Sequence, residues 1–198
     1  MPAVDGRTDL AVLVPVKAFR DAKARLAGVC SAAERATLAR WTADRVVDAA
    51  GTLPVFIACD DRVVADWAEQ RGATVLWRPG LGLNAAVDTS MTDLHGRGVR
   101  HVVVAHADLA RAESLASVAV LGSVTLVPDT MLDGSNVVAL PTGTSFEFAY
   151  GPGSFRRHLE RALALGLPVC VRRDPLLAID IDTPADLTHP LVQEVLPR

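Results

Sequence analysis

The sequence predicts an α/β protein in which helices cover both faces of a mainly parallel sheet. Short apolar, β-branched runs alternate along the chain with longer alanine- and arginine-rich segments of helical periodicity. Half of the 198 residues are hydrophobic and 22% are charged, a balance typical of a folded globular protein. Because a chain of this length can bury one full core, we expect residues 1–198 to form a single domain.

The expected strands are 10–16, 55–59, 74–77, 101–105, 124–127, 137–140, 169–171 and 178–181, and the expected helices are 31–50, 62–71, 83–96, 112–121, 154–166 and 183–195. Ser31 and Glu34 have the spacing of a capping box at the start of the first long helix. The segment 124–150 breaks the alternation, since it contains two strands with no helix between them. We expect a hairpin or antiparallel insertion there.

Composition and charge exclude several classes of protein. The formal net charge is -3 and the chain has no basic tail, which argues against duplex nucleic acid as a partner. No apolar run approaches the roughly 20 residues of a membrane span, and the first residues lack a signal-peptide core. The three cysteines are scattered, so neither a zinc site nor a disulfide framework is indicated. We expect a cytoplasmic protein with no membrane partner.

Several cations follow the first strand, at the edge of the sheet where α/β proteins bind ligands. The stretch 15–26 reads PVKAFRDAKARL and contains Lys17, Arg20, Lys23 and Arg25. It is neither a Walker A loop nor a dinucleotide fingerprint. Taken alone, the stretch fits a solvated amphipathic turn as well as it fits a cradle for phosphates.

Carboxylates follow two other strands. Asp108 ends the strand 101–105, and Asp180 and Asp182 flank the end of the expected strand 178–181. Residues i and i+2 of a strand share a face, so both carboxylates of the second group can point into one site. Asp182 could instead cap the next helix, but capping does not explain Asp180. Together the three acids predict a site for a hard cation such as Mg²⁺.

Two further loops have features of ligand sites. In the loop 78–86, Gly82 allows close approach of a ligand and Asn84 offers a donor and an acceptor for a base edge, although a plain turn explains both. The stretch 150–155 places Gly151, Gly153 and Ser154 before a helix, where free backbone N–H groups favour an anion; a simple helix cap at Ser154 is the alternative. Two separate anion sites indicate the joining of two phosphorylated molecules.

Six motifs occur in the order found in one family: PVKAFRDAKARL, GLGLNAA, ADL, DGSN, FAYGPGSFRRHL and IDIDTPADL. With them the chain resembles the phospholactate and phosphoenolpyruvate guanylyltransferases of coenzyme F-420 biosynthesis. The resemblance runs from the first strand to the last helix. It implies a Rossmann-like three-layer α/β/α sandwich, the MobA-like nucleotidyltransferase fold.

The resemblance also implies roles for individual residues. Lys17 and Lys23 would bind the triphosphate of GTP and act in catalysis with Asp108, with Arg25 as a further phosphate ligand. Gly82 and Asn84 would contact the nucleotide, and Asp108, Asp180 and Asp182 would hold Mg²⁺. Ser135, Gly151, Gly153 and Ser154 would hold the phospho-acid. His158, in the helix after this loop, could contact the acceptor or be structural.

The reaction implied is transfer of GMP from GTP to a phosphorylated three-carbon acid, with release of pyrophosphate. The acceptor is open between 2-phospho-L-lactate, phosphoenolpyruvate and 3-phospho-D-glycerate, and the product would pass to the next enzyme of the pathway. The sequence leaves a homodimer open. Two alternatives remain, namely a molybdenum-cofactor type nucleotidyltransferase and a non-catalytic nucleotide-binding protein of the same fold. The first usually has a glycine-rich loop where this chain has PVKAFRDAKARL.

Overall fold

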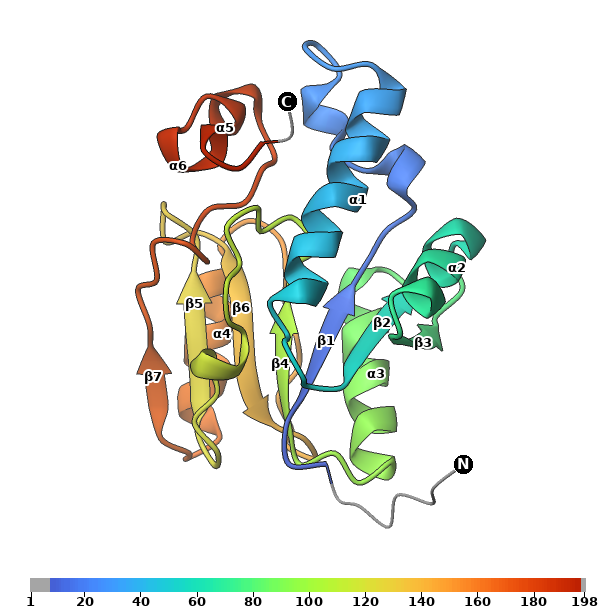
Figure 1. Ribbon diagram of the computed structural model, residues 1–198. Coiled ribbons are helices and arrows are strands. Elements are labelled where there is room, and N and C mark those ends of the chain that lie inside the picture. Colours follow the sequence, from blue (N-terminus) through green and yellow to red (C-terminus); the bar gives the residue numbers. More distant parts are fainter. Residues whose placement is uncertain (1–7, 197–198) are drawn as a thin grey trace.

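The computed structural model describes residues 8–196, and its strands form one mixed sheet (Figure 1). The sheet order is β3-β2-β1-β4-β6-β5-β7. The strands are β1 (Ala11–Pro15), β2 (Val55–Cys59), β3 (Thr74–Trp77), β4 (His101–Ala105), β5 (Val124–Pro128), β6 (Ser135–Pro141) and β7 (Val169–Val171). Only β6 among them runs antiparallel to its neighbours, β4 and β5. The predicted fold class and the expected β5–β6 hairpin are therefore confirmed.

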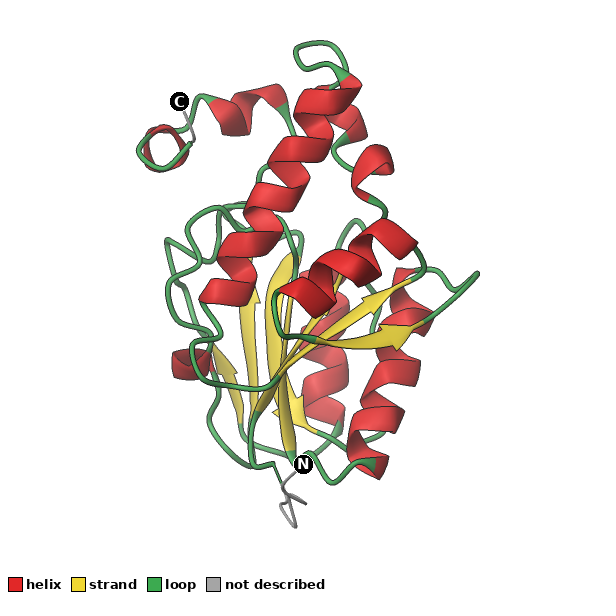
Figure 2. Ribbon diagram, turned by 45° about the vertical axis from the view of Figure 1, so that its right-hand side comes forward, coloured by secondary structure: helices red, strands yellow, loops and turns green. Residues whose placement is uncertain are grey.

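Helices cover both faces of this sheet (Figure 2). They are α1 (Ala32–Asp48), α2 (Arg62–Gln70), α3 (Leu83–Gly96) and α4 (Ser154–Ala164), followed by the short α5 (Pro184–Leu187) and α6 (Pro190–Gln193). Alternate residues of β1 point to opposite faces, as the period of two requires. Val12 and Val14 are buried with residues of α1 and α2, whereas Leu13 is buried with residues of α3 and α4.

Local sequence signals fix where the helices begin. Ser31 Oγ accepts the backbone N–H of Glu34 at 3.3 Å, and the Glu34 carboxylate accepts the N–H of Ser31 at 2.7 Å, so the predicted capping box is formed. Asp61 caps α2 by accepting the N–H groups of Val63 and Val64. The Asp61 cap lies in the lining of the pocket described below.

Three predicted elements are wrong. The segment 112–121 holds only a 3-10 turn at Ala116–Val118, because Leu115 and Val118 are buried in the core and the Leu115 N–H donates to Ala49 O of the preceding chain. The segment 178–181 pairs with no strand of the described sheet. The expected helix 183–195 is two short helices, since Pro190 starts a new one.

The C-terminal segment packs onto the loop that follows β1. Ile179, Ile181 and Val192 form a small apolar cluster with Leu26, and Trp41 of α1 packs against it. This contact carries the end of the chain back to the first loop, beside the carboxyl ends of β1 and β4 (Figure 1). Within residues 8–196, no helix has the length and apolar character needed to cross a membrane.

Candidate active site

A pocket of about 740 Å³ opens at the carboxyl ends of the parallel strands β1 to β4. Its lining comes from the segments that follow each of these strands: 15–25, 58–61, 78–83 and 106–108, together with Asp182. Parallel strands bring their carboxyl ends to one edge of the sheet, which is why segments far apart in sequence meet here. The volume lies within the range of small-molecule sites.

Two apolar anchors hold the loop after β1. Phe19 is buried with its ring edge-on to Trp67 of α2, at 5.4 Å between centroids, and Leu26 is fully buried under the C-terminal segment. Between these anchors the loop makes two 3-10 turns, at Phe19–Asp21 and Ala24–Leu26. The anchors fix the cations of the loop at the mouth of the pocket.

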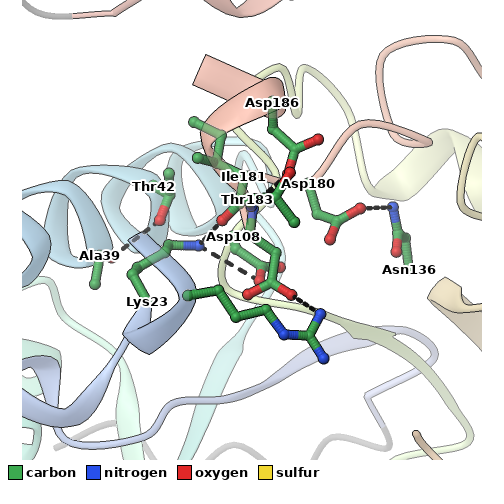
Figure 3. A network of polar contacts seen from close by, with 11 residues as sticks. Lys23, Ala39, Thr42, Asp108, Asn136, Asp180, Ile181, Thr183 and Asp186 are labelled. Atoms are coloured by element: carbon green, nitrogen blue, oxygen red, sulfur yellow. Dashed lines mark hydrogen bonds and ion pairs between the residues drawn. The ribbon is translucent and has the colours of Figure 1, made fainter. Parts of the chain in front are cut away.

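Lys23 is the most constrained of these cations. Its backbone is left-handed, with φ 56° and ψ 36°, a conformation that costs a residue other than glycine about 1 kcal/mol or more. Its side chain is 5% exposed, and Nζ donates to Ile181 O at 2.6 Å and lies 3.4 Å from Asp108 Oδ2 (Figure 3). The ammonium group thus joins the first loop, the end of β4 and the C-terminal segment.

Asp108 and Asp180 lie near each other beyond the end of β4 (Figure 3). Burial acts to raise the pKa of Asp108, but the charges of Lys23 and His106 outweigh it, so this pKa is lowered. Burial first, and then the negative charge of Asp108, raise the pKa of Asp180 to about 6. Asp108 Oδ1 is buried without a hydrogen-bond partner in the described chain. This unrelieved repulsion and this free oxygen fit a divalent cation.

The carboxylate of Asp182, the third acid expected to bind a metal ion, is not grouped with those of Asp108 and Asp180. Its carboxylate accepts a hydrogen bond from Arg25 Nη1 at 2.6 Å, while Asp180 Oδ1 accepts one from Asn136 Nδ2 at 3.4 Å. Across residues 8–196, no three His, Cys, Asp or Glu side chains gather into a metal-ligand group. The same-face argument fails because 178–181 is not a strand. Asp108 and Asp182 line the pocket and Asp180 does not, and the metal-binding role of the three acids stays a prediction.

Lys17 and Arg20 differ in how they are held. Lys17 is exposed on the pocket wall and has no ion pair within the described residues, so its charge is available to a ligand. Arg20 is paired with Asp61, the cap of α2, and lies 3.7 Å from Asp21. Arg20 therefore braces the loop against α2.

Gly82 and Asn84 occupy the start of α3. Gly82 lines the pocket as the cap residue of this helix, with no side chain to block the first-turn N–H groups. Asn84 does not line it: Oδ1 accepts the N–H of Tyr150 at 2.7 Å, and Nδ2 donates to Tyr150 O at 3.4 Å. Asn84 thus ties α3 to the loop before α4, and its contact with the nucleotide stays a prediction.

The four residues expected to hold the phospho-acid lie where the start of β6 meets the start of α4, which we call the β6–α4 junction. They are Ser135, Gly151, Gly153 and Ser154, and none of them is in the pocket lining. The Ser135 N–H donates to Ser154 Oγ at 3.1 Å, which joins the start of β6 to the first residue of α4. Both serines are 2% exposed. Gly151 has φ 115° and Gly153 has φ 70°, so both need the freedom of glycine.

Three of the N–H groups at the start of α4, which were expected to be free, are already bonded. The Gly153 N–H donates to Asp133 Oδ1 at 3.0 Å, and the Phe155 N–H donates to Asp133 O at 2.9 Å. The Ser154 N–H donates to Gly151 O at 3.0 Å. Asp133 thus accepts two of the N–H groups that were expected to be free, and an anion site at this helix start stays a prediction. A ligand at this junction would rely on side-chain donors.

Sequence reasoning passed over Arg78. Its side chain is 12% exposed and lines the pocket, where Nε donates to Ser90 Oγ at 3.1 Å and the guanidinium pairs with Asp93. Its position directly after β3 was the available signal, since the other lining cations and acids also follow strand ends. Arg78 is thus a cation held in the same pocket as the loop 15–25, with its charge paired to Asp93.

Comparison with known proteins identifies the family of this chain. Residues 10–193 match the family model described as "Guanylyl transferase CofC like". The phosphoenolpyruvate guanylyltransferase of Sphaerobacter thermophilus is 35% identical over 189 residues, covering 91% of this chain and 91% of that protein. That of Rubrobacter xylanophilus is 36% identical, covering 89% and 91%. The 2-phospho-L-lactate guanylyltransferase of Methanocaldococcus jannaschii is 25% identical, covering 89% and 80%.

Solved structures share the fold at lower identity. The 4-diphosphocytidyl-2C-methyl-D-erythritol synthase of Anaerococcus prevotii has a TM-score of 0.60 and 10% identity, covering 91% of this chain and 93% of that one. The inositol-1-phosphate CTP transferase of T. maritima has a TM-score of 0.55 and 12% identity, covering 95% of each. These likenesses support the nucleotidyltransferase fold.

Proposed function

Since the chain belongs to the family of CofC-like guanylyl transferases, we propose that it transfers GMP from GTP to phosphoenolpyruvate and releases pyrophosphate. The observation that carries this proposal is the joint placement of Lys17, Lys23 and the Asp108–Asp180 pair at the ends of β1 and β4. Of the relatives compared above, the two that share about a third of their residues with this chain are named for phosphoenolpyruvate. The archaeal relative named for 2-phospho-L-lactate is less similar.

The pocket suits the triphosphate. Lys17 offers an ammonium group at the pocket wall that has no ion pair within residues 8–196, and Arg78 lines the same pocket. Positive charge aimed at the departing pyrophosphate stabilises the charge that develops there. Gly82, at the uncapped start of α3, would let the nucleotide approach the backbone. Lys23 neutralises part of the Asp108 charge and holds the loop in place.

The acceptor needs little activation. A phosphate monoester is ionised at neutral pH, so its oxygen can attack the α-phosphorus of GTP without a general base. Positioning and charge neutralisation would then supply most of the rate enhancement. Ser135 and Ser154, with Gly151 and Gly153 in the same junction, are the groups that we propose to hold the acceptor. Asn84 would keep this junction next to α3.

A divalent cation fits the Asp108–Asp180 pair, for the electrostatic reasons given above, and we propose Mg²⁺. When bound, it would neutralise phosphate charge at the reacting centre. Asp182 lines the pocket, but its carboxylate is paired with Arg25. It could become a third ligand only by giving up that pair. We also propose that the product passes to the next enzyme of coenzyme F-420 biosynthesis.

One assay tests the proposal. The protein is incubated with GTP, Mg²⁺ and, in separate arms, phosphoenolpyruvate, 2-phospho-L-lactate or 3-phospho-D-glycerate, and pyrophosphate release is followed. The next pathway enzyme and its deazaflavin substrate are then added, and the products are identified by mass. We expect the phosphoenolpyruvate arm to have the highest kcat/KM. Faster turnover with another acid would overturn the acceptor assignment, and no release in any arm would overturn the function.

A further inference from the structure

His158 is buried among aromatic rings, beside the two serines of the β6–α4 junction. It is one turn after Ser154 on α4 and has no solvent exposure. Its ring centroid lies 5.6, 5.8 and 5.0 Å from those of Phe146, Phe148 and Tyr150. Burial among these rings, followed by the nearby positive charges, lowers the pKa of His158 to about 4. The imidazole is therefore neutral at physiological pH.

The hydrogen bonds of His158 fix its tautomer. The backbone N–H of Ala149 donates to Nε2 at 2.8 Å, so Nε2 carries the lone pair. A neutral imidazole then carries its proton on Nδ1. Nδ1 lies 3.0 Å from Ser135 Oγ, which must accept this proton. A single backbone contact thus decides the direction of the bond between His158 and Ser135.

This direction leaves the serine hydroxyl protons free. Ser135 Oγ accepts from His158, and its own proton has no acceptor within residues 8–196. Ser154 Oγ accepts the Ser135 N–H, and its proton likewise has no acceptor in the described chain. Two adjacent, nearly buried hydroxyl donors that lack acceptors are costly unless an external acceptor meets them. A carboxylate or phosphate oxygen supplies such an acceptor.

We propose that His158 is a positioning residue, which orients the hydroxyl protons of Ser135 and Ser154 toward an anionic oxygen of the phospho-acid. The inference rests on the proposed function. It adds how the acceptor is recognised at a helix start where the N–H groups of Gly153 and Phe155 already donate to Asp133. His158 would act only through the serines and would not touch the nucleotide pocket, whose lining does not include it.

Four variants test the role: His158→Phe, which keeps the ring but removes both polar atoms, His158→Gln, Ser135→Ala and the double variant His158→Phe/Ser135→Ala. We expect His158→Phe to raise the KM for the phospho-acid about tenfold to 100-fold, the range for one hydrogen bond to a charged group. The KM for GTP should stay within about twofold. Gln has an amide oxygen and an N–H group that can replace both contacts, so it should restore part of the affinity.

The double variant separates positioning from a general structural effect. If His158 acts through Ser135, the double variant should have the same acceptor KM as Ser135→Ala alone. The matched control is His101→Phe. His101 is also a buried histidine whose pKa burial lowers to about 4, but it pairs with Pro141 at the far end of β4. This control should lower stability without changing the acceptor KM.

A spectroscopic readout tests the geometry without turnover. A long-range ¹H–¹⁵N spectrum of the wild type should show His158 as the neutral Nδ1–H tautomer at pH 7, with a shift that changes in Ser135→Ala. An Nε2–H tautomer would overturn the inference, as would an unchanged acceptor KM in His158→Phe or strictly additive effects in the double variant. These results leave the proposed function intact. Absence of wild-type turnover with every phospho-acid would overturn the function and the acceptor role together.

Discussion

Lys23 Nζ lies 3.4 Å from Asp108 Oδ2 and also donates to the carbonyl of Ile181, so one buried side chain connects three distant parts of the chain. The ion pair joins the loop after β1 to the end of β4, and the hydrogen bond adds the C-terminal segment. Because the ammonium group is almost completely buried, its main contribution is to hold the site together. Lys17, only six residues earlier, is exposed on the pocket wall.

Lys23→Met should lower the free energy of unfolding by about 2 to 3 kcal/mol, because it leaves the partly buried Asp108 carboxylate without its partner. Urea denaturation measures this loss. Lys17→Met is the matched control and should change the free energy by no more than about 0.5 kcal/mol, since Lys17 is exposed. Adding Asp108→Asn to Lys23→Met should recover part of the loss. Equal effects of the two lysine variants would refute the distinction.

Lys17→Ala should raise the KM for GTP about tenfold or more without lowering stability, because Lys17 is exposed on the pocket wall and free of internal ion pairs in the described chain. Steady-state kinetics with GTP as the varied substrate tests this. The acceptor KM should change little. Arg97→Ala, which removes an exposed cation at the other end of α3, should leave both KM values unchanged.

Asp108→Asn and Asp180→Asn should each reduce pyrophosphate release at least 100-fold, about 3 kcal/mol of transition-state stabilisation. Without a divalent cation, Asp180→Asn should leave the protein as stable as the wild type or more stable, because it removes first the cost of burying a charged carboxylate and then the repulsion from Asp108. Thermal unfolding in EDTA tests the second expectation. Glu113→Gln, at an exposed acid, is the control for both. Near-normal turnover in either Asn variant at saturating Mg²⁺ would rule out the cation assignment.

The alternation of strand and helix patterns along the sequence, with its break at 124–150, was enough to predict the sheet, the hairpin and the edge at which the pocket opens. Periodicity could not predict the region 178–195, where the pattern of apolar residues serves a cluster around Leu26 and not a strand. The sequence also did not show which residues far apart in the chain contact one another. Nothing in the loop 15–26 indicates that Lys23 is buried against Ile181 while Lys17 has no ion pair within the described residues. Nothing near Ser154 indicates that Asp133 accepts hydrogen bonds at the start of α4.

Two buried histidines should each lower the free energy of unfolding as the pH falls from 6.5 to 4. Burial lowers the pKa of His101 and of His158 to about 4, whereas an unfolded histidine titrates near 6.5. In that window each of these two side chains binds more protons in the unfolded chain than in the folded one, so its contribution to the free energy of unfolding falls as the pH falls. Asp180, whose pKa is raised to about 6, acts in the opposite direction. Each histidine can contribute about 2 to 3 kcal/mol by pH 4. Urea denaturation at a series of pH values measures the slope, which His158→Gln should reduce. An unchanged slope in that variant would show that His158 does not titrate with a lowered pKa.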